Sequence, residues 1–255
     1  MDQANGKSEL VSTGKPKYIE GLHAEPELNI VPDLHVLYED NHLLLVFKPH
    51  RLLIQKDSTG DFTLFKQACL WLKQKYSKPG NVYLGLIHRL DRPASGIVIF
   101  AKTSKAASRL SEQFRAKTVE KKYMILVEGV PQLTQGKCLN YLSDPLDGRA
   151  EVHDLEVPGT KRSEMNYQVI GSKSGISLVE VELLTGRRHQ IRAQMAHLGH
   201  PIVGDVRYGS KAVFSQGAVA LVASSIAFEH PISKAVITFD LPDPLHSVRR
   251  YWNEL

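Results

Sequence analysis

Residues 88–96, HRLDRPASG, bring together side chains that can do chemistry. One carboxylate, Asp91, lies between Arg89 and Arg92, shortly before the apolar run at residues 97–100. Such a run predicts a buried strand, so we expect Asp91 in a basic loop at the mouth of a strand. Neighbouring positive charge favours an ionised carboxylate. A fixed, ionised carboxylate can be a nucleophile, a general base or the partner of a cation, although an aspartate flanked by arginines is often only a surface ion pair.

Residues 184–192, LTGRRHQIR, form a second basic cluster. The pattern predicts the end of a strand, a tight turn at Gly186 and the start of a helix. Backbone N–H groups at a helix start, together with the guanidinium groups of Arg187 and Arg188, can bind an anion. A solvated surface is the alternative reading of these arginines. However, arginines at a helix start oppose the local dipole, and such a local inconsistency is typical of a functional site.

Three histidines raise the alternative of a metal site. His189, His197 and His200 could be joined by Asp91 or Asp205. The spacing from His189 to His197 suits no common short ligand pair, and His200 falls in a loop. We therefore expect no metal ligands in this chain.

Composition narrows the class of protein. The chain has 255 residues, which is long enough to bury a core, and 42% of them are hydrophobic and 23% charged. Its net charge of +5 suits a polyanionic partner. Two cysteines without a disulfide or metal-ligand pattern favour a reducing compartment. No apolar run is long enough to span a bilayer, and no signal peptide is recognisable. We expect a cytoplasmic monomer that does not associate with membranes.

The pattern of apolar residues predicts the elements. Residues 1–31 are polar and aperiodic and predict a loose arm, whereas residues 32–255 predict a single domain. We predict strands at 36–38, 43–47, 97–100, 122–130, 167–170, 176–184, 219–228 and 235–239, and helices at 64–76, 104–114 and 189–198. Ser104 is the predicted cap of the second helix, and residues 138–157 are predicted to be turn-rich. Strands outnumber helices without alternating with them, which favours an α+β fold with a large mixed, mostly antiparallel sheet flanked by helices and loops.

Four motifs in order carry a resemblance to a known family. They are residues 88–96, residues 121–123 (KKY), residues 185–192 and residues 198–205 (LGHPIVGD). Together they resemble the RluA-type pseudouridine synthases, which isomerise uridine in ribosomal or transfer RNA. The match extends from about Val36 to Leu241. The resemblance implies the pseudouridine-synthase fold, a stem-loop of tRNA or rRNA as partner, and a reaction that needs neither cofactor nor metal.

The resemblance also implies roles for individual residues. Asp91 resembles the family's nucleophile, Arg192 the basic residue that pairs with it, and Leu221 an apolar residue packed against the site. Tyr123 resembles the tyrosine that stacks on the base and is implicated in proton handling. Arg89 resembles the arginine that fills the gap left by the flipped-out uridine. These roles suit an enzyme that must extrude a base, because aromatic stacking is worth about 1–3 kcal/mol per base and a planar guanidinium can occupy the vacated space.

Further basic and polar residues are predicted to bind the RNA, with solvated surface charge as the alternative. The predicted phosphate contacts are Lys48, Lys121, Arg187 and Arg188, and His189 and Gln190 complete the RNA-binding set.

The chain departs from the family pattern at three places. Ala94 replaces the usual threonine, His50-Arg51 stands in the Lys-Pro-x-Gly motif, and Val222 replaces a histidine. These departures leave open a non-catalytic RNA-binding or RNA-folding protein on the same fold, and a metal-dependent hydrolase is the third alternative. We expect no S4-like RNA-binding module. The short chain favours tRNA slightly, and residues 143–157 and 209–217 are the predicted specificity loops.

Overall fold

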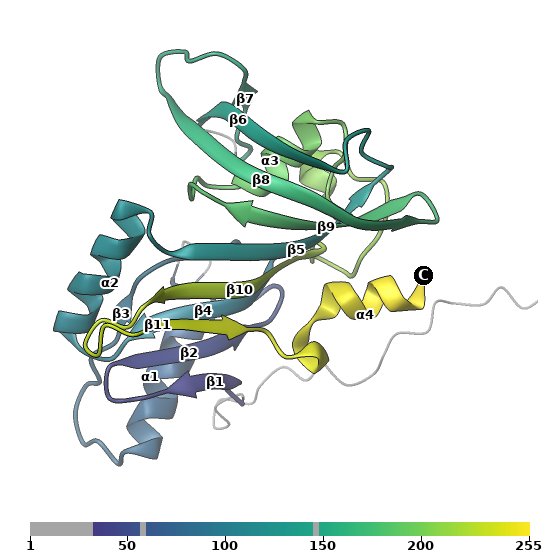
Figure 1. Ribbon diagram of the computed structural model, residues 1–255. Helices are drawn as coiled ribbons and strands as arrows, with labels where there is room; N and C mark the ends of the chain where they lie inside the picture. The colour runs from purple at the N-terminus through teal and green to yellow at the C-terminus, as the bar shows by residue number, and fades with distance from the viewer. Residues whose placement is uncertain (1–32, 57–59, 145–147) are drawn as a thin grey trace, which may run out of the picture. The chain divides into compact units, whose positions relative to one another are not determined.

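A computed structural model describes residues 33–56, 60–144 and 148–255 (Figure 1). The predicted arm at residues 1–31 lies outside this part of the chain. The described residues form one 11-stranded sheet, in the order β1-β2-β4-β10-β5-β9-β8-β6-β7, with β3 beside β4 and β11 beside β10. Only β4 and β10 pair in parallel among the strands described, so the predicted mixed, mostly antiparallel sheet is confirmed.

The bounds of the elements are as follows. The strands are β1 (Val36–Glu39), β2 (Leu43–Lys48), β3 (Gly85–Leu86), β4 (Ser95–Ala101), β5 (Glu120–Glu128), β6 (Gln135–Ser143), β7 (Val152–His153), β8 (Thr160–Lys173), β9 (Ile176–Leu183), β10 (Leu221–Glu229) and β11 (Val236–Asp240). The α-helices are α1 (Leu64–Lys75), α2 (Ser104–Ala116), α3 (Gln190–His197) and α4 (Ser247–Glu254), and the 3-10 helices are η1 (Val206–Tyr208) and η2 (Asp243–Leu245).

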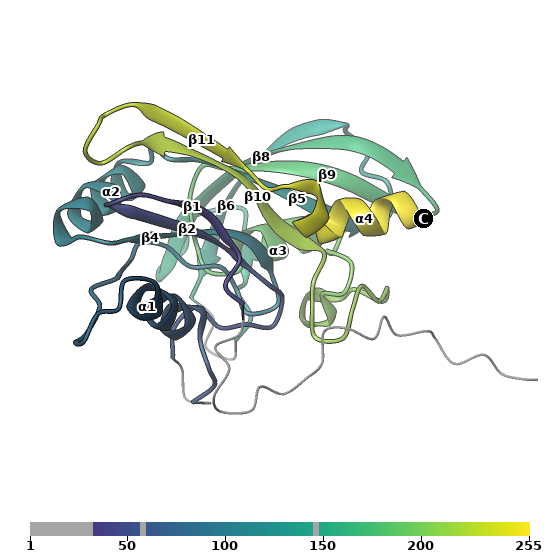
Figure 2. The same cartoon turned by 90° about the horizontal axis from the view of Figure 1, so that it is seen from below.

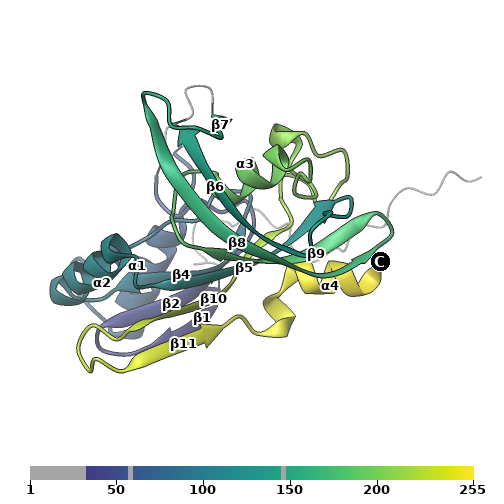
Figure 3. The same ribbon diagram turned by 45° about the horizontal axis from the view of Figure 1, so that its top comes forward.

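Strand β4 lies between β2 and β10 in the sheet. Every one of its residues is buried. It pairs with β2 from Leu43 opposite Ala101 to Lys48 opposite Gly96. A continuous apolar strand is expected where both faces are covered. Figure 2 shows α1 and α3 on the same side of the sheet, and Figure 3 shows β6 and β8 curving around α3.

Gly96 allows β4 and β10 to approach each other closely. Its φ is +126°, and a Cβ atom there would lie 2.4 Å from the carbonyl oxygen of Ala223 and 2.5 Å from its nitrogen. Only glycine tolerates both the backbone conformation and the contact. The Ser-Gly step after Asp91 therefore brings the end of the Asp91 loop against the neighbouring strand.

Most predicted elements are present, and three predictions need correction. The cap of α2 is Thr103, not Ser104, because the Thr103 side chain accepts a hydrogen bond from the Ala106 N–H. Residues 138–157 are not simply turn-rich, because most of β6 and all of β7 lie there. Strand β8 begins well before the predicted 167–170, and α4 was not predicted at all.

Candidate active site

The sheet order brings three of the four predicted catalytic residues together. Asp91 lies in the loop before β4, Leu221 opens β10, and Tyr123 lies in β5 opposite Ala223 of β10. Because β4, β10 and β5 are neighbours inside the sheet, the segments that carry these three residues lie side by side. Arg192 reaches the same place from the first turns of α3.

The predicted ion pair between Asp91 and Arg192 is present. Nη1 of Arg192 lies 3.1 Å from Oδ2 of Asp91, whose side chain is 26% exposed. On its other side Arg192 donates from Nε and Nη2 to the two oxygens of Asp205, at 2.6 and 2.8 Å. Burial opposes the charge of Arg192, but Asp205 and Asp91 raise the pKa of its guanidinium above the ordinary value. One permanent cation is therefore shared by a buried carboxylate and a solvent-facing one.

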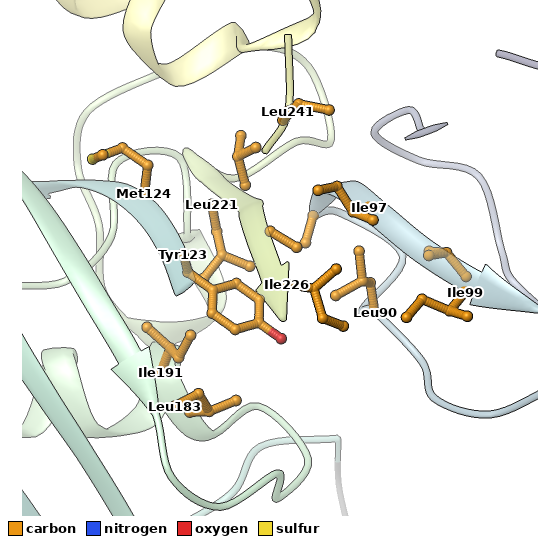
Figure 4. Close-up of a cluster of buried hydrophobic side chains, with 14 of the residues drawn as sticks. Leu90, Ile97, Ile99, Tyr123, Met124, Leu183, Ile191, Leu221, Ile226 and Leu241 are labelled. Atoms are coloured by element: carbon orange, nitrogen blue, oxygen red, sulfur yellow. The ribbon is translucent and has the colours of Figure 1, made fainter. Parts of the chain in front are cut away.

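Tyr123 and Leu221 form the apolar wall of the site. Figure 4 shows the Tyr123 ring beside Leu183, Ile191 and Leu221, with the hydroxyl directed away from them on the side of Leu90. Tyr123 is 7% exposed and Leu221 5% exposed. Burial, helped by the charge of Asp91, raises the pKa of the Tyr123 hydroxyl, so it stays protonated at neutral pH.

His189 lies against the carboxylate rather than on the surface. Its Nε2 is 3.7 Å from Oδ2 of Asp91, and its Nδ1 is 3.0 Å from the hydroxyl of Tyr208. Burial lowers the pKa of His189 to about 4, so its imidazole is neutral at pH 7. A residue predicted to bind RNA therefore belongs to the surroundings of Asp91.

Two other residues predicted to bind RNA are also buried. Lys48 has no exposed surface, and its Nζ donates to the carbonyl oxygens of Pro49, Arg92 and Ala94 at 3.0, 3.1 and 2.6 Å. A phosphate contact requires an accessible ammonium group, so the structure instead gives Lys48 the role of holding the Asp91 loop. Burial lowers its pKa to about 7, whereas the three carbonyl acceptors favour its protonated form.

Gln190 closes the turn before α3 and is 2% exposed. Its Oε1 accepts hydrogen bonds from the Thr185 hydroxyl at 2.7 Å and from the Arg187 N–H at 3.0 Å. The predicted contact of Gln190 with RNA is therefore replaced by a structural role. The other predicted contacts do reach solvent: Arg89, Arg187 and Arg188 are exposed, and Lys121 is half-buried with its ammonium 6.0 Å from the Phe114 ring centre.

Three of the residues that depart from the family pattern, Ala94, His50 and Val222, have other contacts, and Arg51 is exposed. Ala94 is buried, and its carbonyl oxygen accepts from Lys48. His50 contacts the carbonyl oxygen of Pro93 through Nδ1 at 2.8 Å and the hydroxyl of Ser247 through Nε2 at 3.0 Å. Val222 is fully buried in β10. None of these residues contacts the Asp91 carboxylate.

The histidines of the metal alternative have separate partners. His189 contacts Tyr208, His197 contacts Asp154, and His200 donates to the carbonyl oxygen of Glu128. No group of three His, Cys, Asp or Glu is arranged to hold a metal ion in the part of the chain that the structure describes. Asp205, considered from the sequence only as a possible ligand, is instead the buried partner of Arg192. Its place in the motif at residues 198–205 was the only sequence signal for this role.

This sheet, with an ion-paired aspartate in the loop before β4 and a buried tyrosine in β5, agrees with the pseudouridine-synthase class that the sequence motifs indicated. A model of the RNA pseudouridylate synthase family matches residues 42–197, and the chain belongs to this family. It is 33% identical over 227 residues to ribosomal large subunit pseudouridine synthase C of Buchnera aphidicola subsp. Baizongia pistaciae, covering 84% of this chain and 69% of the relative. It is 32% identical over 245 residues to the uncharacterized RNA pseudouridine synthase YhcT of Bacillus subtilis, covering 92% and 78%.

Solved structures agree with this assignment. The structure of human RNA pseudouridylate synthase domain containing 1 is 27% identical with a TM-score of 0.66, and the match covers 87% of each chain. Human RNA pseudouridylate synthase domain containing 4, at 22% identity and a TM-score of 0.69, has the same fold. The protein is an RNA pseudouridine synthase, an isomerase. Within the described residues, no helix has the length and apolar character needed to cross a membrane.

Proposed function

We propose that Asp91 is the nucleophile, that Tyr123 and Leu221 hold the extruded uracil, and that Arg192 keeps the carboxylate charged and aimed. The observation that carries this proposal is the ion pair of 3.1 Å between Arg192 and a carboxylate that still faces solvent. A carboxylate oriented by a buried cation is held in place for nucleophilic attack.

The reaction proceeds by exchange of the bond at C1′ of the ribose. A carboxylate oxygen of Asp91 bonds to C1′ while the C1′–N1 bond breaks, and uracil leaves with the electron pair. The uracil turns, C5 bonds to C1′, and the carboxylate is released. C5 loses its proton and N1 gains one, so the product is an isomer of the substrate. Tyr123 enters as a neutral phenol because of its raised pKa, and its ring face stacks on the base.

RNA must present the uridine outside its stack. The cost of unstacking, on the order of a few kcal/mol, is offset if a guanidinium fills the vacated space. Arg89 suits this role because it is exposed and forms no ion pair with any residue that the structure describes. Arg187 and Arg188 are exposed beside the site and suit phosphate contacts.

We propose large-subunit ribosomal RNA as the substrate to test first, ahead of the tRNA that chain length favours. The support is that relatives such as synthase C of Buchnera aphidicola and synthase D of Zymomonas mobilis, at 33% and 32% identity, are named for the large ribosomal subunit. We further propose that the protein acts as a monomer in a reducing cytoplasm, where Cys69 and Cys138 stay free thiols.

The test is tritium release from RNA labelled at C5 of uridine, with rRNA fragments and tRNA transcripts offered separately. Wild type should release tritium, whereas Asp91→Asn should fold, bind RNA and release none. Asp243→Asn, which changes an exposed aspartate paired with Arg249, is the matched control and should be fully active. Residual turnover by Asp91→Asn would reject the nucleophile. Binding without release by wild type on every RNA would favour the non-catalytic alternative.

A further inference from the structure

The two oxygens of the Asp91 carboxylate are not equivalent. Arg192 Nη1 lies 3.1 Å from Oδ2, and His189 Nε2 lies 3.7 Å from the same oxygen. Oδ1 receives no hydrogen bond and no ion pair from any of the described residues. One oxygen is therefore held from two sides, and the other is free to meet a substrate.

Tyr208 favours one tautomer of His189. The Tyr208 hydroxyl accepts from the Ala150 N–H at 2.8 Å and lies 3.0 Å from Nδ1 of His189, to which its own hydrogen can be donated. Nδ1 is then the acceptor, so a neutral ring carries its hydrogen on Nε2. That N–H faces the negative Oδ2, whereas the other tautomer would turn a lone pair toward it. Both ends of the ring thus favour the same tautomer.

The backbone is strained at His189. Its φ is 56°, in the left-handed region, immediately before α3. Such a conformation costs on the order of 1–3 kcal/mol for a residue other than glycine and persists only where its surroundings impose it. The hydrogen bonds of Gln190 to Thr185 and Arg187 hold the turn next to it. In this conformation the imidazole lies beside Asp91.

Burial is the main reason that the His189 ring stays neutral. Asp91 faces it from the loop before β4 and favours the protonated ring. Burial opposes protonation more strongly, and so do the positive charges of Arg188, Arg192 and Arg207. Tyr208, on η1 like Arg207, stays a neutral phenol at pH 7 because burial raises its pKa. The neutral ring, with the Nε2–H that faces Asp91, is therefore the form present at pH 7.

We propose that His189, fixed as its Nε2–H tautomer by Tyr208, is a positioning residue that holds Oδ2 of Asp91 together with Arg192 and leaves Oδ1 to attack C1′. The proposal rests on Asp91 being the nucleophile. In the attack the Oδ1–C1′ bond forms, the C1′–N1 bond breaks with its electrons passing to N1, and His189 keeps its proton. The separation of 3.7 Å is longer than a hydrogen bond, and such contacts tighten when substrate binds.

The tautomer is tested directly by ¹⁵N NMR of the imidazole ring in the full chain. The His189 signals are assigned by their loss in His189→Gln. Wild type should show a protonated Nε2 and an unprotonated Nδ1. Tyr208→Phe removes the hydroxyl and keeps the ring, so it should give a mixture of tautomers. Tyr83→Phe, at a half-exposed tyrosine, is the matched control and should leave the signals unchanged. An unchanged single tautomer in Tyr208→Phe would overturn the role of Tyr208.

The effect on Asp91 is tested by single-turnover tritium release. His189→Ala should react about tenfold more slowly, as expected when one donor to a charged group is removed, with RNA affinity within about twofold of wild type. His189→Gln should recover part of the rate, because its amide can donate. The control is His197→Ala, at an exposed histidine that ends α3.

The outcomes separate this proposal from the one on which it rests. A wild-type rate in His189→Ala, or a loss confined to RNA affinity, would reject the positioning role while Asp91→Asn remains inactive. Turnover by Asp91→Asn would reject the nucleophile and the positioning role together. If His189→Ala does not fold, Tyr208→Phe carries the kinetic test, with a smaller slowing expected.

Discussion

At the scale of the residue, the site depends on a cation that is shared unequally. Arg192 forms two hydrogen bonds with Asp205, which is 1% exposed, and one with Asp91. Its guanidinium can take only the direction that the buried carboxylate sets. The position of the Nη1 atom beside Asp91 is therefore set by a buried residue behind it.

Removing Asp205 should affect both folding and rate. Asp205→Ala leaves a buried guanidinium with only Asp91 as partner, and breaking a buried pair costs about 3–5 kcal/mol. We expect the free energy of unfolding in urea to fall by that order and tritium release to slow. Asp243→Ala removes an exposed partner of Arg249 and should cost less than about 1 kcal/mol. Equal, small losses in both variants would show that Arg192 does not need Asp205.

The sequence predicted part of this site and not the rest. The pairing of Asp91 with Arg192 followed from the motifs. The burial of Lys48 did not, because a lysine at the end of an apolar run normally reaches solvent. The side chain of Lys48 instead turns inward to three carbonyl groups, two of them in the distant Asp91 loop. Contacts between segments far apart in the chain leave no local pattern.

At the scale of the element, His88 joins the strand of the catalytic loop to its neighbouring helix. Its Nε2 accepts from the Ile99 N–H of β4 at 3.1 Å, and its ring stacks on Phe114 of α2 at 5.1 Å between centres. An accepting nitrogen requires a neutral ring in this place. Burial, with the nearby charge of Lys121, lowers the pKa of His88 to about 4.

His88 should make the protein less stable in mild acid. Its pKa is lower in the folded state than the ordinary 6.5, so the unfolded chain binds the extra proton. The stability that His88 confers is complete above pH 6.5 and is lost as pH falls toward 4, by about 2–3 kcal/mol. Urea unfolding from pH 7 to 4.5 should show this extra loss in wild type and not in His88→Gln. His197→Gln, at an exposed position, should follow wild type, and parallel curves for all three proteins would contradict the assignment.

Elements were predictable where burial and hydrophobicity agree. Strand β2 and strand β4 are apolar runs and are buried almost throughout. In β6 burial does not follow hydrophobicity, because Asn140 is buried whereas Leu139 is 44% exposed. The sequence of β6 therefore lacks the alternation of apolar and polar residues that predicts a strand. Helix α4 is short and follows two prolines, so its sequence does not predict a helix. In the structure it packs against β5 and β10.

At the scale of the whole molecule, basic side chains flank the site on two sides. Arg89 precedes Asp91 in the same loop, the half-buried Lys121 lies 6.0 Å from the ring centre of Phe114 in α2, and Arg187 and Arg188 precede α3. The carboxylate of Asp91 contacts Arg192 of α3 and belongs to the loop that follows Arg89, so it is linked to both basic groups. An RNA that delivers its uridine to Asp91 therefore places phosphates within reach of both flanks.

Removing the α3 flank should weaken RNA binding, because fewer phosphates are then neutralised. Each phosphate that a cationic side chain no longer neutralises lowers the slope of log affinity against log salt by about 0.7–0.9. The double variant Arg187→Gln/Arg188→Gln should therefore reduce this slope by about 1.5. Its loss of affinity should be largest at low salt. Lys73→Gln/Lys78→Gln removes the same charge from exposed lysines of α1 and the turn after it, and is the matched control. Binding titrations over about 50 to 300 mM salt distinguish local contacts from net charge. Equal slopes in the two double variants would mean that only the total charge of the molecule attracts RNA, since a specific flank must lose more than a distant surface.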